Sequence, residues 1–158
     1  MHSARHLTSL YLVRDRRVLL LYRRGSRAIP DSWVGIGGHL EPAELTDPTA
    51  AALRELHEEL GITPEQLADL ALRYVAVRDT GTEIRTTYYF TAELDAEAVV
   101  PAECSEGDLA WFDLVEDPRL DMPVTARVAF THWLAVGRHD RKLRFVAVDA
   151  EGHEMGPA

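Results

Sequence analysis

GGHLEPAELTDPTAAALRELHEELGI, residues 37–62, opens with a glycine pair, crosses a polar loop and enters a run of residues with high helix propensity. Asp47 or Thr46 can cap the start of that run, and Pro48 suits the first helical position. Gly61 suits the position just past the last turn. The stretch therefore predicts one well-delimited helix that follows a glycine turn and a loop.

One face of this predicted helix carries three acidic residues. At about 100° per residue, Glu55, Glu58 and Glu59 fall within an arc of roughly 100°, and three leucines on the adjacent arc can face a core. Arg54 is close enough to pair with Glu58, but the three carboxylates are not neutralised locally. Two carboxylates about 5 Å apart repel by roughly 3 kcal/mol at an effective dielectric near 20. A solvated face is the simple interpretation. The alternative is a Mg²⁺ or Mn²⁺ site, since these ions prefer carboxylate oxygens.

The complete string is more specific than its acids, and it resembles the Nudix box, G-x5-E-x7-R-E-U-x-E-E-x-G-U, in which U is an aliphatic residue. The matching residues are, in order, Gly38, Glu44, Arg54-Glu55-Leu56, Glu58-Glu59 and Gly61-Ile62. Two positions depart from the pattern: nine residues rather than seven separate Glu44 from Arg54, and Ala43 stands where many members have glycine. The longer spacer leaves open whether Glu44 pairs with the box arginine as it does in the family.

This resemblance implies a Nudix-type α/β/α sandwich with a mixed sheet. It also implies a pyrophosphohydrolase that cleaves a nucleoside diphosphate linked to another group. In the family, box acids and a main-chain carbonyl at the start of the box bind the metal, which here points to Glu55, Glu58, Glu59 and Gly38. We expect these groups to bind Mg²⁺, with Mn²⁺ as an alternative. We expect Arg54 to hold a neighbouring carboxylate rather than touch the substrate.

Hydrolysis of a pyrophosphate bond also needs a general base. Glu55 is one candidate. Glu106, in the segment SEGDLAW, is a second, because some Nudix enzymes place a base or an extra metal ligand on a loop outside the box. An exposed loop acid is the alternative interpretation of Glu106, and Glu103 and Asp108 are close rivals for the role.

Three residues are candidates for contact with the substrate. Arg24, in preference to its neighbour Arg23, can reach a phosphate, since arginine binds phosphate through two parallel hydrogen bonds. Trp111 can stack on a base and Asp113, on the same strand face, can hydrogen-bond to it. Solvated charge is the alternative for Arg24, and core packing is the alternative for Trp111.

The substrate itself is less well defined than the site. The stretch LYRRGSRAIPDSWVGIGGHLE resembles MutT-like members, which hydrolyse nucleoside triphosphates, including oxidised purine nucleotides, to the monophosphate and pyrophosphate. Members that act on ADP-ribose or on dinucleoside polyphosphates share the same box, so these substrates stay open. A catalytically silent Nudix domain that only binds a nucleotide is a further alternative.

Outside the box, the sequence predicts strands before and after the central helix. The β-rich segments are 7–13, 17–23, 33–36, 71–79, 83–94, 109–114 and 142–148. A second helix is predicted over 123–137, and residues 150–158 are expected to form a loose tail. This order of elements indicates an α/β (α+β) fold with a mixed sheet between helices.

Length and composition limit the remaining possibilities. A chain of 158 residues has the size of one domain, so residues 1–158 are expected to form a single Nudix hydrolase domain. A net charge of −9 argues against binding of a nucleic acid polymer and leaves a small nucleotide as the expected partner. Cys104 is the only cysteine, and no apolar run approaches the ~20 residues of a membrane span. We therefore expect a cytoplasmic protein without a membrane partner; a homodimer stays open.

Overall fold

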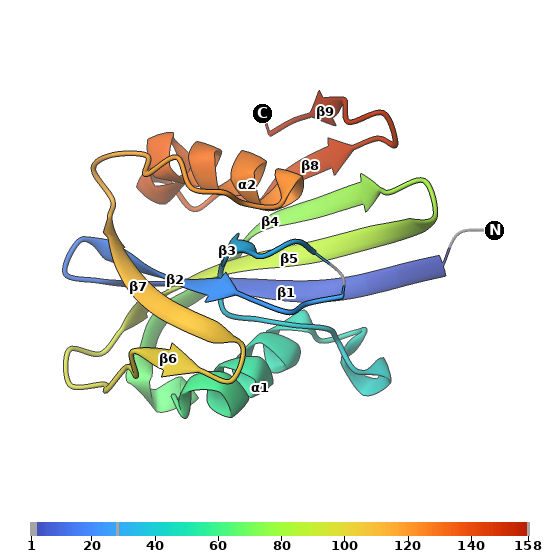
Figure 1. Cartoon of the computed structure of the whole chain (residues 1–158). Helices are drawn as coiled ribbons and strands as arrows, with labels where there is room; N and C mark the ends of the chain where they lie inside the picture. Colours follow the sequence, from blue (N-terminus) through green and yellow to red (C-terminus); the bar gives the residue numbers. More distant parts are fainter. Residues whose placement is uncertain (1–2, 28, 158) are drawn as a thin grey trace.

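The computed structural model describes residues 3–27 and 29–157, which form one mixed sheet between two helices (Figure 1). The strands are β1 (Ser3–Arg14), β2 (Arg17–Arg23), β3 (Ser32–Val34), β4 (Leu67–Asp79), β5 (Glu83–Leu94), β6 (Glu103–Cys104), β7 (Gly107–Asp113), β8 (Arg144–Val148) and β9 (Glu154–Met155). The helices are α1 (Pro48–Leu60) and α2 (Val124–Ala135), with short 3₁₀ turns η1 (Pro42–Glu44), η2 (Pro64–Gln66) and η3 (Gly137–His139).

The strands of the sheet lie in the order β6-β7-β2-β1-β5-β4-β8-β9, and β3 pairs with β2 beside this path. The pairs β1–β5 and β4–β8 are parallel, and the other pairs are antiparallel. The predicted mixed sheet is therefore confirmed. The predicted strand segments each fall on or beside an observed strand, and β4 begins four residues earlier than predicted, at Leu67.

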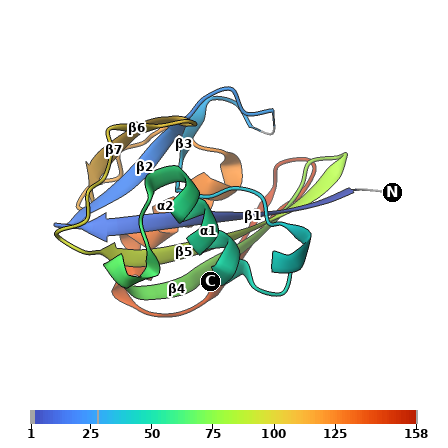
Figure 2. The same ribbon diagram turned by 90° about the horizontal axis from the view of Figure 1, so that it is seen from below.

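The two helices cover opposite faces of the sheet, as Figures 1 and 2 show from two directions. β2 explains why both faces need a cover: Leu19 and Leu21 belong to the core cluster under α1, whereas Val18 and Leu20 belong to the cluster under α2. A strand with apolar residues on both faces is stable only when both faces are buried. The structure confirms the α/β/α sandwich.

Both ends of α1 match the signals in the sequence. The Asp47 side chain accepts a hydrogen bond from the backbone N–H of Ala50 at 3.2 Å, and Pro48 occupies the first turn. Gly61 adopts a left-handed conformation (φ 70°), and its N–H donates to the His57 carbonyl at 2.8 Å. These caps fix where the acidic face of the helix begins and ends.

The strand predicted over residues 33–36 ends at Val34, and the glycine pair that follows runs beside β1. After β3, the chain pairs with β1 through isolated bridges of Ile36 with Leu10 and of His39 with Leu7. The backbone N–H of Thr8 donates to the Gly38 carbonyl at 2.9 Å. This pairing brings the start of the box against the sheet and holds it opposite α1.

The segment predicted as a loose tail contains β9, which pairs with β8 in antiparallel register. Neither helix of the described chain has the length and apolar character that a membrane span requires.

Candidate active site

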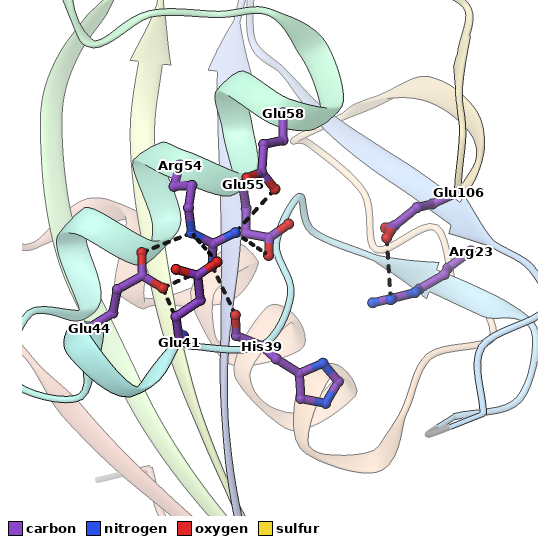
Figure 3. A network of polar contacts seen from close by, with 8 residues as sticks. All are labelled: Arg23, His39, Glu41, Glu44, Arg54, Glu55, Glu58 and Glu106. Atoms are coloured by element: carbon purple, nitrogen blue, oxygen red, sulfur yellow. Dashed lines mark hydrogen bonds and ion pairs between the residues drawn. The ribbon is translucent and has the colours of Figure 1, made fainter.

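Arg54 on α1 joins the two halves of the box (Figure 3). Its Nε and Nη2 atoms each donate to one carboxylate oxygen of Glu44 at 2.9 Å, a two-pronged ion pair. Glu44 is largely buried, and this hydrogen bond from Arg54 holds its pKa below the ordinary value. The pairing that the longer spacer left open is therefore formed, and η1, which ends at Glu44, holds this carboxylate in place through its hydrogen bond with the Glu41 N–H.

Arg54 also reaches the acids expected to bind metal. Its Nη1 atom donates to Glu55 and to Glu58, each at 3.1 Å, and its Nη2 atom donates to the His39 carbonyl at 3.0 Å. The expectation that the acids are not neutralised locally is thus wrong for Glu55 and Glu58. The predicted contact with a neighbouring carboxylate is present, and Arg54 connects η1, the glycine segment and α1 in one network.

Glu59 is the acid without a cation. Both of its carboxylate oxygens are buried and have no hydrogen-bond partner among the described residues, and the same holds for one oxygen of Glu106. Burial, followed by the adjacent Glu106 carboxylate and the charge of Glu55, raises the pKa of Glu59 well above its ordinary value of 4.5. Two adjacent carboxylates repel each other unless one of them holds a proton. Once ionised, Glu59 needs a cation that the described residues do not supply.

Gly38 leaves the space that Glu55 occupies. A Cβ atom at Gly38 would lie 2.6 Å from a carboxylate oxygen of Glu55, closer than real contacts allow. Burial is also the largest cause of the raised pKa of Glu55. The box therefore has glycine at this position because the backbone passes so close to the Glu55 carboxylate that a side chain would not fit.

A divalent cation fits this donor set. Hard cations take carboxylate and carbonyl oxygens, and Glu59 offers two buried oxygens without a donor among the described residues. The backbone ligand expected at Gly38 is engaged, since its carbonyl accepts from Thr8, whereas no hydrogen bond among the described residues uses the carbonyl of Gly37. The three box acids do not all lie within 4.8 Å of one another in this structure. In the described chain only the exposed group Asp149, Glu151 and His153, at the turn after β8, is that compact.

The structure places the other predicted site residues differently. Glu106 lies beside Glu59, as the role of base or ligand requires. Arg24 is exposed and pairs with Asp108, and Asp113 is exposed and accepts from the backbone of Val115. Trp111 packs in the core cluster under α1, with the Arg14 guanidinium 5.0 Å from its ring centre. Of these residues, only Glu106 is brought to the box acids.

The sequence analysis missed a basic pocket next to Gly38. Arg23, Arg78 and Arg85 line it, together with apolar and hydroxyl side chains of the sheet and the start of α2. Arg23 also approaches Glu106, with Nη2 and Oε1 3.4 Å apart, so the pocket adjoins the acids (Figure 3). The strand pattern contained a signal for part of it, because a hairpin over 71–94 places arginines of its two strands near each other.

His39 lies at the edge of this pocket. Its Nε2 atom is 3.0 Å from Nη1 of Arg5, and as arginine can only donate, Nε2 is the acceptor. Partial burial, followed by the charges of Arg5, Arg23 and Arg85, lowers the pKa of His39. Guanidinium groups from three strands therefore make the surroundings of His39, beside the box, positively charged.

Comparisons with known proteins agree with this geometry. Residues 4–134 match the family described as NUDIX domain. The chain is 31% identical over 116 residues to the NAD-capped RNA hydrolase NudC of Chromobacterium violaceum. That alignment covers 73% of this chain and 41% of NudC, so the chain spans about two fifths of the relative's length.

Solved structures share the fold. The MutT protein of Bacillus halodurans superposes with a TM-score of 0.66 at 23% identity, over 96% of this chain and 95% of that chain. A bifunctional NMN adenylyltransferase/ADP ribose pyrophosphatase of Francisella tularensis gives 0.61 at 22% identity, over 86% of this chain and 42% of that chain. The chain belongs to the Nudix family.

Proposed function

We propose that this Nudix hydrolase requires Mg²⁺ and cleaves nucleoside triphosphates to the monophosphate and pyrophosphate. The observation that carries the metal requirement is Glu59, whose two buried oxygens lack donors among the described residues and which lies beside the carboxylate of Glu106. Such a pair is costly without a cation and becomes a ligand set with one.

Glu55, Glu58 and Glu59 would hold the metal, with a carbonyl of the glycine pair as a further ligand. The Gly37 carbonyl suits this role better than that of Gly38, because the latter already accepts from Thr8. When bound, Mg²⁺ neutralises the pyrophosphate oxygens and favours deprotonation of water. Mn²⁺ is expected to substitute for it, since it accepts the same oxygen ligands.

The chain's own side chains would then position the metal-binding acids and take the proton from the attacking water. Arg54 holds Glu55 and Glu58 in place through Nη1 and is itself fixed by Glu44, so its role is positioning. Glu55 and Glu106 are the candidates for the base that takes the proton from water. Burial raises the pKa of Glu55, which moves this carboxylate toward the range in which a base works best near neutral pH.

A second substrate class has an observation in its favour. The relative with 31% identity is named for hydrolysis of NAD-capped RNA, in which the cap is a dinucleotide joined through a pyrophosphate. The basic pocket beside Gly38 supports a substrate that extends beyond the scissile bond. Dinucleotides and ADP-ribose are therefore included in the test.

The test is a panel of nucleoside triphosphates, oxidised purine triphosphates, ADP-ribose and dinucleotides, incubated with and without Mg²⁺. Release of pyrophosphate from triphosphates supports the proposal. Cleavage confined to ADP-ribose or dinucleotides would replace the substrate assignment and keep the site. If the wild type binds nucleotides but cleaves none of them with either Mg²⁺ or Mn²⁺, the domain is a catalytically silent binding module and the proposal is overturned.

A further inference from the structure

Three arginines lie in a row across adjacent strands on the α2 side of the sheet. Arg5 on β1 is directly opposite Arg85 on β5, and Arg85 is directly opposite Arg78 on β4. Side chains alternate between the two faces of a sheet, so Arg85 and Tyr89, four residues apart on β5, point to the same face. Tyr89 belongs to the core cluster under α2. The row therefore continues the face that α2 covers, at the end of the sheet where the apolar cluster stops.

The row is short of negative charge. Glu83 is shared, because its Oε2 atom accepts from Nε of Arg5 at 2.9 Å and from Nε of Arg85 at 3.0 Å. Arg78 forms no hydrogen bond or ion pair through its side chain with the described residues, and its Nε atom is buried. Like charges directly opposite on neighbouring strands destabilise a sheet. In a chain of net charge −9, this concentration of positive charge is not part of a generally basic surface.

The row adjoins the catalytic site without belonging to its acid network. Arg78 and Arg85 line the same pocket as Gly38 and Arg23, and Arg23 contacts Glu106 at the acids. The acids already provide for the scissile pyrophosphate under the proposed function.

We propose that Arg78 and Arg85 bind a phosphate group of the substrate that is not part of the scissile pyrophosphate. The enzyme then selects nucleotides that carry an additional phosphomonoester, such as a 2′- or 3′-phosphate on a ribose. A planar guanidinium matches two phosphate oxygens, and Arg78 has its donors free of partners in the described chain. This inference rests on the proposed function for the site of cleavage, and among the proposed substrates it favours the second class, in which the scissile pyrophosphate joins a nucleotide to another group.

The test compares kcat/KM for matched pairs that differ by one phosphate: NADPH and NADH, ADP-ribose 2′-phosphate and ADP-ribose, and coenzyme A and dephospho-coenzyme A. We expect the phosphorylated member of at least one pair to be preferred by about 10- to 100-fold, the value of one or two charge-assisted hydrogen bonds. Arg78→Gln and Arg85→Gln should each remove most of this preference, by lowering kcat/KM of the phosphorylated member more than kcat/KM of the unphosphorylated member.

Arg17→Gln is the matched control, since Arg17 is an exposed arginine at the start of β2 outside the pocket. It removes the same charge and should keep the preference. Equal losses of Arg78→Gln on both members of a pair would show contact with the shared nucleotide and overturn the inference. So would a wild type that prefers no phosphorylated member.

A binding measurement separates this inference from the proposed function. Inorganic phosphate, added without divalent metal, should raise the Tm of the wild type and of Arg17→Gln more than that of Arg78→Gln or Arg85→Gln. Without phosphate, Arg78→Gln should melt at or above the wild-type temperature because it relieves repulsion within the row, whereas Arg85→Gln also loses the ion pair with Glu83. If no nucleotide is cleaved, the proposed function fails while this measurement still decides the role of the arginines. An equal shift by phosphate in all four proteins would contradict it.

Discussion

Glu59 on α1 and Glu106 on the loop before β7 are far apart in the sequence, yet their carboxylates are adjacent, and both oxygens of Glu59 and one oxygen of Glu106 are buried. Arg23 lies beside Glu106, whereas Glu59 has no cation among the described residues. Burial of an ionisable group in this way costs free energy, so selection for stability alone would replace Glu59. A bound divalent cation would offset that cost.

Replacement of Glu59 should separate activity from stability. Glu59→Gln removes a metal ligand and should lower kcat by about 10²- to 10³-fold or more, as expected for the loss of charge stabilisation in a transition state. The same change removes a buried charge, so the Tm of the metal-free variant should equal or exceed that of the wild type. Steady-state kinetics and thermal unfolding measure the two effects. Glu97→Gln, on an exposed residue outside the site, serves as the control and should change neither. Near wild-type turnover of Glu59→Gln would refute its role as a ligand.

The stability of the metal-free protein should depend on pH through Glu59. Its pKa is raised in the folded state above the ordinary value of 4.5, so its contribution to stability is fully present below that value. The contribution is lost as the pH rises toward the folded pKa. The wild type should therefore lose Tm relative to Glu59→Gln as the pH rises from 4.5 toward the raised pKa of Glu59, and Mg²⁺ should reduce the loss because it replaces the proton. Parallel Tm curves for the two proteins across this range would contradict the raised pKa.

Substitution at Gly38 tests the close approach of backbone and acid. A Cβ atom there would meet Glu55 at 2.6 Å, so Gly38→Ala should displace this carboxylate. We expect weaker binding of Mg²⁺ and a kcat lower by about 10- to 100-fold, with a smaller effect on Tm. Metal titration and kinetics of the folded variant provide the measurement. Unchanged metal affinity would show that Glu55 is not a ligand in this position.

The ion pair of Arg54 with Glu44 should act through positioning. Glu44→Gln keeps the shape but removes the charge that accepts both guanidinium hydrogen bonds, and it should destabilise the protein by about 1–3 kcal/mol. It should also lower kcat by about 10-fold, because Arg54 then holds Glu55 and Glu58 less firmly. Denaturant unfolding and kinetics distinguish this variant from Glu59→Gln, which is expected to lose activity without losing stability. A stable Glu44→Gln with full activity would remove Arg54 from the account.

The box helix could be predicted because its signals are local. Asp47, Pro48 and Gly61 mark its ends, and the spacing of the acids places them on one face whatever the rest of the chain does. The α/β/α fold followed from the same box through its family resemblance. What the sequence could not decide was how the longer spacer would fold, because pairing of Glu44 with Arg54 depends on the path of residues 45–53 between them.

The substrate side of the site was harder to predict because it depends on strand pairing. Arg24 was preferred over Arg23, but Arg23 is the last residue of β2 and lines the pocket, whereas Arg24 lies beyond the strand and pairs with Asp108. The hairpin of β4 and β5 was predicted without its register. A shift of one residue would move Arg78 to the other face, so the arginine row becomes visible only when the pairing with Arg85 is known.

Binding of a divalent cation to the box acids is the central claim, and a titration with Mn²⁺ followed by electron paramagnetic resonance tests it most directly. The titration is made on the wild type, Glu59→Gln and Glu97→Gln, with a non-hydrolysable nucleotide present. The account predicts that the wild type and Glu97→Gln bind Mn²⁺ alike, that Mg²⁺ competes, and that Glu59→Gln binds at least about tenfold more weakly. Equal affinity of Glu59→Gln and the wild type, or no binding by the folded wild type, would contradict it.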